Sequence, residues 1–150
     1  MSCAAAPALA PSSQADYNQV PRGGSNGDYH TIVLAPNSIQ EAIDMIGKAF
    51  DLADEYRNPV IIAADGMLGQ MMEPVVLPER VEKLPEKPWA TTGHKGERKH
   101  NIVDSLYLTA DELERLNIER FERYETVKAR EQRAETFMCE DADIVLVSFG

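Results

Sequence analysis

The stretch from Asp65 to Pro74 holds the side chains of this chain that are best suited to contact a ligand or a partner. It carries two carboxylates, two glycines and three methionines, and it directly follows an apolar run, Val60–Ala64. Ligand sites of open parallel sheets lie beyond the carboxyl ends of the strands, and methionine adapts to irregular surfaces. The pattern favours packing or a subunit contact over direct ligand contact for Asp65, Met67, Leu68, Met71 and Met72.

A second polar cluster lies in the middle of the chain, where His94 and His100 flank Lys95, Arg98 and Lys99. Two histidines without a third ligand at a familiar spacing are a weak basis for a metal site. The cations could hold an acidic partner or a phosphate, but a solvated loop explains such a charge run better. We therefore predict neither a metal ligand nor a catalytic residue in this chain.

Glycines and cysteines add no further site. The run Gly23–Gly27 precedes a strand instead of joining a strand to a helix, and it lacks the Gly-Lys-Ser/Thr ending of a phosphate-binding loop. Cys3 and Cys139 lie far apart without a Cys-x-x-Cys motif, so we expect no zinc site or iron–sulphur cluster held by this chain alone. A reducing, cytoplasmic setting is the default for such cysteine usage.

A strand–helix–strand unit precedes the Asp65–Pro74 stretch and must position it. The first strand is the apolar run Thr31–Leu34, and Ser38 with Glu41 three places on predicts a capping box at the start of the helix. The helix should end near residue 57, because the residue before Pro59 avoids the α region. The order of these elements predicts a parallel β-α-β unit.

The two faces of this unit can also be predicted. The second strand, Val60–Ala64, shows no polar alternation, which indicates a strand covered on both faces of a parallel sheet. A single unit of this kind is too small to close a core, so we expect the chain to need further polypeptide. The helix is predicted to lie on the sheet through its apolar residues Ile39, Ala42, Ile43, Ile46, Ala49, Phe50, Ala53 and Tyr56.

The remaining sequence predicts a linker, an exposed helix and a final strand. Prolines 78, 85 and 88 exclude a continuous helix there, and Trp89 should anchor the connector to a neighbouring surface. Thr109 with Glu112 predicts a second capping box, and a narrow apolar stripe predicts a helix over residues 109–136 that packs on one side. Residues 141–150 have the pattern of a buried strand that ends in glycine, as at the start of a new α/β domain.

The composition fits a globular protein and excludes some partners. The chain has 150 residues, of which 43% are hydrophobic and 27% charged, and its formal net charge is −10. Phosphate binding relies on clustered Lys and Arg, so nucleic acid is not an expected partner. No apolar run is long enough to span a bilayer. We expect neither nucleic-acid nor membrane binding.

Several segments together resemble the alpha subunit of 2-oxoacid:ferredoxin oxidoreductases, most closely the branched-chain (2-oxoisovalerate) type. The resemblance follows the chain in order and covers nearly all of it. The segments that carry it are SQADY (13–17), GDYHTIVLAP (27–36), FDLADEYRNPVIIAADGMLGQMMEP (50–74), PWATTG (88–93), SLYL (105–108) and DADIVLVSFG (141–150).

This resemblance implies a fold class and a division of the chain. The fold is α/β: a partial parallel-sheet domain of the thiamine diphosphate pyrimidine-binding type, a linker, and the first strand of a domain similar to the transketolase C-terminal domain. Residues 1–77 would be the later part of the thiamine domain, 78–140 the linker with its exposed helix, and 141–150 the start of the truncated second domain.

The resemblance also implies a reaction, cofactors and partners. The family decarboxylates 2-oxoacids oxidatively, passes the acyl group to coenzyme A and sends electrons through iron–sulphur clusters to ferredoxin. The chain would act beside beta, gamma and delta subunits, with thiamine diphosphate and Mg²⁺ in the full complex and no cofactor held by this chain alone. The resemblance places Ser13, Gln14 and Asp16 at the edge of the cofactor pocket and the loop after Asp65 near a subunit contact.

Departures from the family's pattern predict that the chain is inactive alone. Ala4–Ala10 replaces a glycine-rich run of the family, and alanine cannot adopt all of glycine's conformations. The glutamate that activates the pyrimidine has no counterpart here, and the Gly-Asp-Gly motif that holds the thiamine metal is also missing. Two alternatives remain open: a nucleotide- or flavin-binding α/β module, and a non-catalytic interaction protein whose 109–136 helix docks a partner.

Overall fold

Two parallel strands and the helix between them form the packed part of one of the two units of the chain. The computed structural model describes residues 19–22, 27, 29–81 and 86–148. By its internal contacts the chain divides into two units, one made of Met1–Glu79 with Arg133–Gly150 and one of Arg80–Gln132. Each unit has its own elements of secondary structure.

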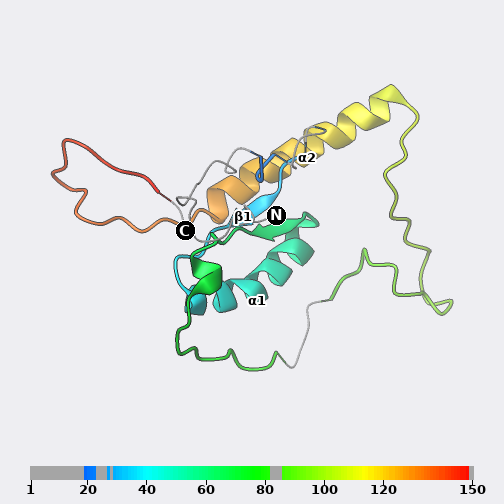
Figure 1. Ribbon diagram of the computed structural model, residues 1–150. Coiled ribbons are helices and arrows are strands. Elements are labelled where there is room, and N and C mark those ends of the chain that lie inside the picture. The colour runs from blue at the N-terminus through cyan, green and yellow to red at the C-terminus, as the bar shows by residue number, and fades with distance from the viewer. Residues whose placement is uncertain (1–18, 23–26, 28, 82–85, 149–150) are drawn as a thin grey trace. The chain divides into compact units, whose positions relative to one another are not determined.

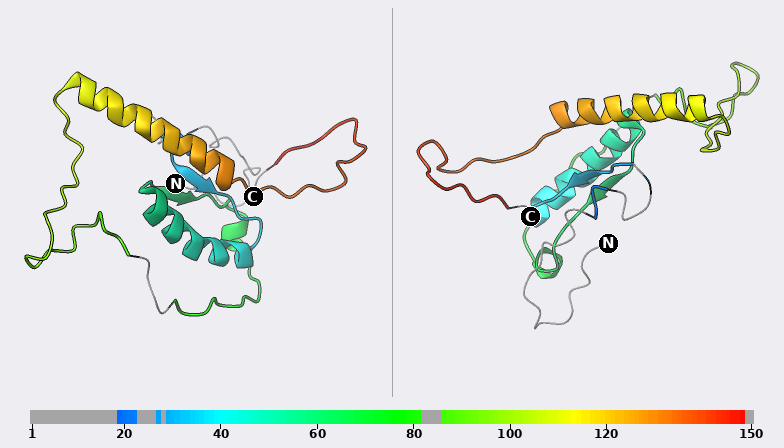
Figure 2. Two further views of the ribbon diagram at one scale, coloured as in Figure 1. Left: turned by 180° about the vertical axis from the view of Figure 1, so that it is seen from behind. Right: turned by 90° about the horizontal axis from the view of Figure 1, so that it is seen from above.

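The predicted β-α-β unit is present in the first unit. Strand β1 spans Ile32–Leu34, helix α1 spans Ile39–Tyr56 and strand β2 spans Val60–Ile62. The strands pair in parallel, with Ile32 opposite Val60 and Leu34 opposite Ile62. Helix α1 packs against β2, and the views from the front, from behind and from above show it beside the sheet (Figures 1 and 2). The α/β prediction is confirmed at this level.

Local interactions define both ends of α1 as predicted. The Ser38 hydroxyl accepts a hydrogen bond from the Glu41 amide at 3.1 Å. The Glu41 carboxylate accepts one from the Asn37 amide at 2.8 Å, one residue before the cap, so the capping box is confirmed with a small shift. At the other end, Arg57 takes the left-handed conformation at φ 49°, and its amide donates to the Ala53 carbonyl. The helix therefore stops before Pro59.

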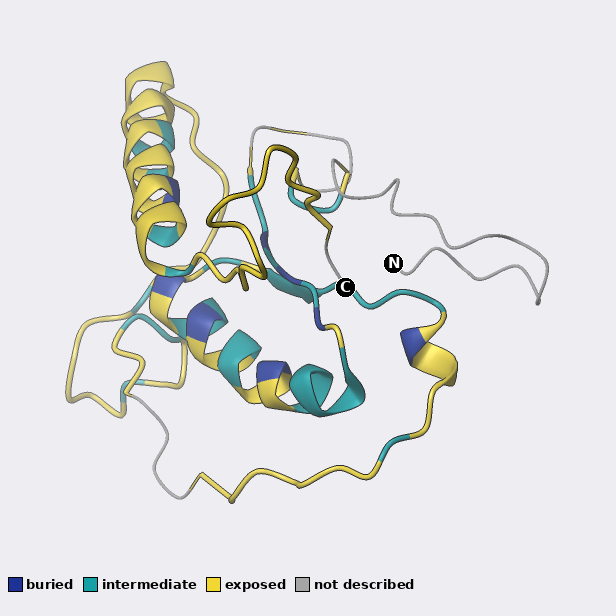
Figure 3. Ribbon diagram, turned by 90° about the vertical axis from the view of Figure 1, so that its left-hand side faces the viewer, coloured by how far each residue is buried: buried dark blue, intermediate teal, exposed yellow. Residues whose placement is uncertain are grey.

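The predicted buried face of α1 is partly wrong. Met45 and Leu52, which the prediction left out, are buried together with Tyr56, whereas Ile46 and Phe50 are 50% and 71% exposed. Apolar residues cover about half of the helix circumference at 100° per residue, and a two-stranded sheet covers only one side of that arc. Figure 3 shows the buried positions on α1 and β1.

The sheet itself is covered less than the sequence predicted. Ile32 and Leu34 of β1 are buried, but every residue of β2 is only half-buried, so the described residues do not cover β2 on both faces. The segment at Val20 lies beside Thr31, the residue before β1. The Thr31 amide donates to the Pro21 carbonyl at 2.9 Å and the Thr31 hydroxyl to the Val20 carbonyl at 2.5 Å. Among the described residues, no strand pairs with the outer edge of β2.

The second unit contains helix α2, Ala110–Arg130, which ends before the predicted boundary at residue 136. Its apolar stripe has no member after Val127, and helices draw most of their stability from packing of such a face. The predicted capping box is wrong, because Thr109 makes no side-chain bond to an amide. Its hydroxyl instead donates to the Glu112 carboxylate at 3.3 Å.

The final segment does not form the expected strand. Residues 141–148 contain no regular element, and their side chains are exposed. A strand needs a neighbouring strand to satisfy its backbone groups, and none of the residues that the structure describes pairs with this segment. In the part of the chain that is described, no helix is both long and apolar enough to cross a membrane.

Candidate functional site

The loop after β2 is built around a carboxylate that caps a short turn. The Asp65 side chain accepts a hydrogen bond from the Leu68 amide at 2.7 Å, and the Asp65 carbonyl accepts one from Gly69 at 3.3 Å. These bonds start the 3₁₀ helix η3, Leu68–Gln70, whose Leu68 side chain is buried. The carboxylate of Asp65 therefore has a structural role in fixing the first turn of the loop.

The first turn of α1 lies at the carboxyl end of β1, where parallel sheets often bind anions. Three amides at or just before this turn are bound by side chains of the chain itself. The amides of Asn37, Ile39 and Glu41 donate to the side chains of Glu41, Glu73 and Ser38, respectively. Two of these three acceptors are carboxylates, so a phosphate at this position would meet negative charge. The arrangement argues against the nucleotide- or flavin-binding module.

The chain then runs from η3 back to α1 through residues 71–77, here called the return segment. The Gln40 side chain forms two hydrogen bonds with Val76: its oxygen accepts from the Val76 amide at 2.7 Å and its nitrogen donates to the Val76 carbonyl at 3.0 Å. Met72, Val76 and Leu77 are 97%, 78% and 75% exposed. The return segment is thus apolar and exposed, yet attached to α1.

The structure brings the predicted contact residues together in one loop but orients them differently. Met67, Met71 and Met72 are exposed, and Asp65 is half-buried. Leu68 packs inward and is part of the core, so its side chain is not available to a partner. Gln40 and Glu73, which hold the return segment, were not among the predicted site residues. No local pattern indicates their contacts, since they join positions 34 and 36 residues apart.

Ser13, Gln14 and Asp16, predicted at the edge of a cofactor pocket, lie outside the described residues. Their placement therefore stays a prediction.

The loop of residues 88–101 is held together by its own polar side chains. Arg98 donates to the carbonyls of Ala90 and Gly93 at 3.2 and 2.9 Å, and Asn101 donates to the Ala90 carbonyl at 3.0 Å. Arg98 therefore closes the loop, which leaves a smaller basic cluster than the sequence suggested. Trp89, the predicted anchor, is half-buried in this loop.

The two histidines of this loop do lie together. The ring centroids of His94 and His100 are 4.1 Å apart in an edge-to-face arrangement. Nδ1 of His94 accepts a hydrogen bond from the Gly96 amide at 3.0 Å, so that ring nitrogen is occupied. The described residues contain no group of three or more His, Cys, Asp or Glu side chains that could hold a metal ion.

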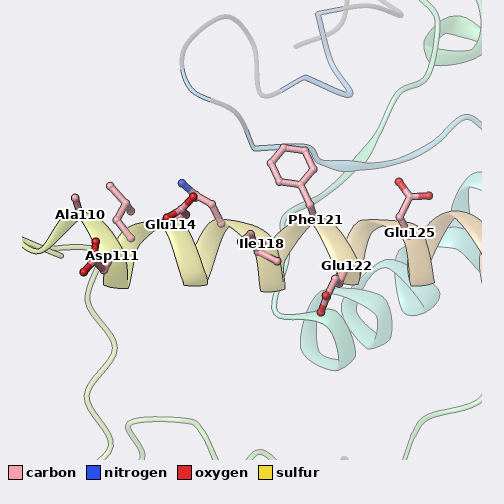
Figure 4. A pocket seen from close by; sticks show the side chains of 9 residues that line it. Ala110, Asp111, Glu114, Ile118, Phe121, Glu122 and Glu125 are labelled. Carbon is pink, nitrogen blue, oxygen red and sulfur yellow. The ribbon is translucent and has the colours of Figure 1, made fainter.

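A shallow groove runs along α2. All of the residues that line it belong to this one helix, so it is a surface of α2 and not an enclosed site (Figure 4). It mixes an apolar floor with carboxylates and holds none of the predicted site residues. The lining residues are Ala110, Asp111, Leu113, Glu114, Asn117, Ile118, Phe121, Glu122 and Glu125.

Comparison with known proteins identifies the family. The profile of the family described as "Pyruvate flavodoxin/ferredoxin oxidoreductase, thiamine diP-bdg" matches residues 3–140. The chain belongs to this family. It is 54% identical over 138 residues to the ketoisovalerate oxidoreductase subunit VorB of Methanothermobacter marburgensis, and the alignment covers 91% of this chain and 39% of VorB. The resemblance to this class of oxidoreductase subunit is confirmed.

Further relatives are also similar. VorB of Methanothermobacter thermautotrophicus is 46% identical over 138 residues, which again are 91% of this chain and 39% of the relative. The 2-oxoglutarate synthase subunit KorA of M. marburgensis is 45% identical over 80 residues, which cover 51% of this chain and 21% of KorA. The chain thus spans well under half the length of these relatives. No solved structure matches it.

The family's description names thiamine diphosphate, and the described residues can be tested against that group. A diphosphate with its metal needs free donors and a set of oxygen ligands. The amides of Asn37, Ile39 and Glu41, at or just before the start of α1, are bound by the chain's own side chains, and the described residues hold no group of side chains that could bind a metal. The described part of this chain therefore does not fit the diphosphate end of the cofactor.

Proposed function

We propose that this chain is part of a ferredoxin-dependent oxidoreductase that converts branched-chain 2-oxoacids and coenzyme A to acyl-CoA, and that it is inactive alone. The observation that carries the proposal is the 54% identity to a ketoisovalerate oxidoreductase subunit over 91% of the chain. The 2-oxoglutarate synthase subunits are 34–47% identical and cover 47–74% of the chain, against 91% for both ketoisovalerate oxidoreductase subunits, which favours a branched-chain substrate.

The cofactors of the proposed reaction belong to the assembled complex. Thiamine diphosphate supplies the carbanion chemistry when bound, while protein groups orient the substrate and exclude water. We propose that Mg²⁺, coenzyme A and the iron–sulphur clusters are held by other parts of the complex. Ser13, Gln14 and Asp16 are proposed to line the edge of the pyrimidine pocket.

The proposed partners are the other subunits of the enzyme, which we name beta, gamma and delta by analogy with the family, and ferredoxin. The formal charge of −10 makes nucleic acid an unsuitable partner. We place the assembled enzyme in the cytoplasm. Three exposed methionines after β2, at positions 67, 71 and 72, support a subunit contact at that loop, because adaptable apolar side chains of this kind are common at binding surfaces.

We further propose that residues 141–150 pair with a strand of a following domain similar to the transketolase C-terminal domain, with residues 78–140 as the linker. The apolar side chains of Ile144, Leu146 and Val147 support this, since they are 80% or more exposed in the chain alone. Burial of such side chains would stabilise the strand by roughly 1.5–3 kcal/mol each.

Reconstitution tests the proposal. The chain should show no reduction of a viologen dye with 2-oxoisovalerate and coenzyme A. Adding thiamine diphosphate, the remaining subunits and the polypeptide that corresponds to the rest of the VorB length should give dye reduction. Omitting the chain from the mixture is the control and should lower activity. Turnover by the chain alone, or an assembled enzyme that prefers 2-oxoglutarate, would contradict the proposal.

A further inference from the structure

The loop that follows β2 begins and ends beside the short connection between β1 and α1. At its start, the Ala63 amide donates to the carbonyl of Leu34, the last residue of β1, at 2.8 Å. Near its end, the Glu73 carboxylate accepts from the amide of Ile39, the first residue of α1, at 3.2 Å. Compact surface loops whose ends lie close together are called Ω-loops. The loop after β2 is closed in the same way, and Glu73 is one of the residues that close it.

Gln40, the second residue of α1, makes another closing contact. Its side-chain oxygen accepts from the Val76 amide at 2.7 Å, and its nitrogen donates to the Val76 carbonyl and to the Asp44 carboxylate, each at 3.0 Å. The reverse orientation of the side-chain amide would place a donor against the Val76 amide and the oxygen against two acceptors. The surroundings therefore fix Gln40 in the one orientation that holds Val76.

The same return segment makes both closing contacts, at residues three positions apart. Its side chains contribute little packing, since Met72, Val76 and Leu77 are all at least 75% exposed. Forming either contact restricts the backbone of the segment, which costs conformational entropy. Once one contact has formed, the other needs less further restriction, so each contact favours the other.

We propose that Gln40 and Glu73 form a latch that holds the loop after β2 in one of two states. In the closed state both contacts are made, and in the released state both are broken. Release frees the Ile39 amide and lets the exposed methionines of the loop change position together. The latch is a property of this chain's own fold, so it depends neither on the proposed reaction nor on a bound partner.

Amide hydrogen exchange on the full chain tests whether the two contacts open together. Glu73→Met removes the acceptor of the Ile39 amide but leaves Gln40 and Val76 unchanged. If the latch opens in one step, the Val76 amide should nevertheless exchange about twofold to tenfold faster, the range expected for the loss of one hydrogen bond. Gln40→Met should likewise speed the exchange of the Ile39 amide.

Three controls separate the latch from a general loss of stability. Glu73→Gln keeps an oxygen that can accept from the Ile39 amide, so Val76 should exchange at close to the wild-type rate. Glu55→Met places a methionine at an exposed position near the other end of α1 and should leave both amides unchanged. The amide of Leu52, in the body of α1, should keep its rate in every variant.

The rate at Val76 in Glu73→Met decides between one opening step and two independent ones. Faster exchange of Val76 with an unchanged rate at Leu52 supports the latch. An unchanged rate at Val76 means that the two contacts open independently of each other, which overturns the proposal. Equal acceleration at Val76 and Leu52 traces the effect to unfolding of the whole β-α-β unit and also overturns it.

Discussion

The two sides of α1 should differ sharply in their contribution to stability. Leu52 has no exposed surface, whereas Phe50, two residues earlier on the same helix, is 71% exposed. Truncating a fully buried leucine costs about 2–5 kcal/mol, whereas surface substitutions usually change the free energy of unfolding by less than about 0.5 kcal/mol. Leu52→Ala should therefore destabilise α1 severely, and Phe50→Ala should not.

Amide hydrogen exchange within α1 is the suitable assay, because it reports on this helix separately from α2. Every 1.4 kcal/mol is about a tenfold change in an equilibrium constant, so Leu52→Ala should lower protection by roughly thirtyfold or more. Both variants introduce alanine, the best helix former, into the same helix, so a loss of protection cannot come from lower helix propensity. Equal loss of protection in the two variants would refute the assignment of Leu52 to the packed side of α1 and Phe50 to its exposed side.

The same pair can be measured in the assembled enzyme. If a partner or a further domain covers the side of α1 that carries Ile46 and Phe50, then Phe50→Ala should become costly there, by about 3–5 kcal/mol for a buried phenylalanine. A cost that appears only on assembly would identify this side as an internal contact of the complex.

Four further substitutions test individual features. Ser38→Ala should cost about 1 kcal/mol in the free energy of unfolding of α1, measured by hydrogen exchange, whereas Thr109→Ala should change α2 little because Thr109 bonds no amide. Arg57→Gly should stabilise α1 by about 0.5–1 kcal/mol in urea titrations, because φ 49° suits glycine better. Met72→Glu should leave the stability of the chain unchanged but weaken its binding to the other subunits about tenfold, and normal binding would contradict the proposed contact.

The two ends of α1 could be predicted from the sequence because residues close to each end determine where the helix starts and stops. The start of α1 follows from Ser38 and Glu41, and its end follows from Pro59, so neighbouring residues alone were enough to predict both. The same rule failed at Thr109, where the hydroxyl bonds a nearby carboxylate instead of an amide. A capping sequence shows which hydrogen bonds the side chain can make, but the neighbouring groups in the folded chain determine which of these bonds forms.

Properties that depend on distant residues could not be predicted. The apolar arc of α1 is wide enough for two contacts, and only the size of the sheet decides that Leu52 is buried and Phe50 is not. The bonds of Gln40 to Val76 join positions 36 residues apart and leave no trace in local composition. The family, in contrast, could be predicted from the sequence because its motifs are specific over nearly the whole chain.

The outer edge of β2, with which none of the described strands pairs, has a consequence for handling the isolated polypeptide. A strand edge with open amides and carbonyls is a template for pairing with another copy, and Val60 and Ile62 are favourable β-formers. The formal charge of −10 opposes such association, and dissolved salt screens that repulsion. Higher ionic strength should therefore speed the aggregation of the isolated chain. Co-production with a polypeptide that pairs with β2 should remove this dependence on salt.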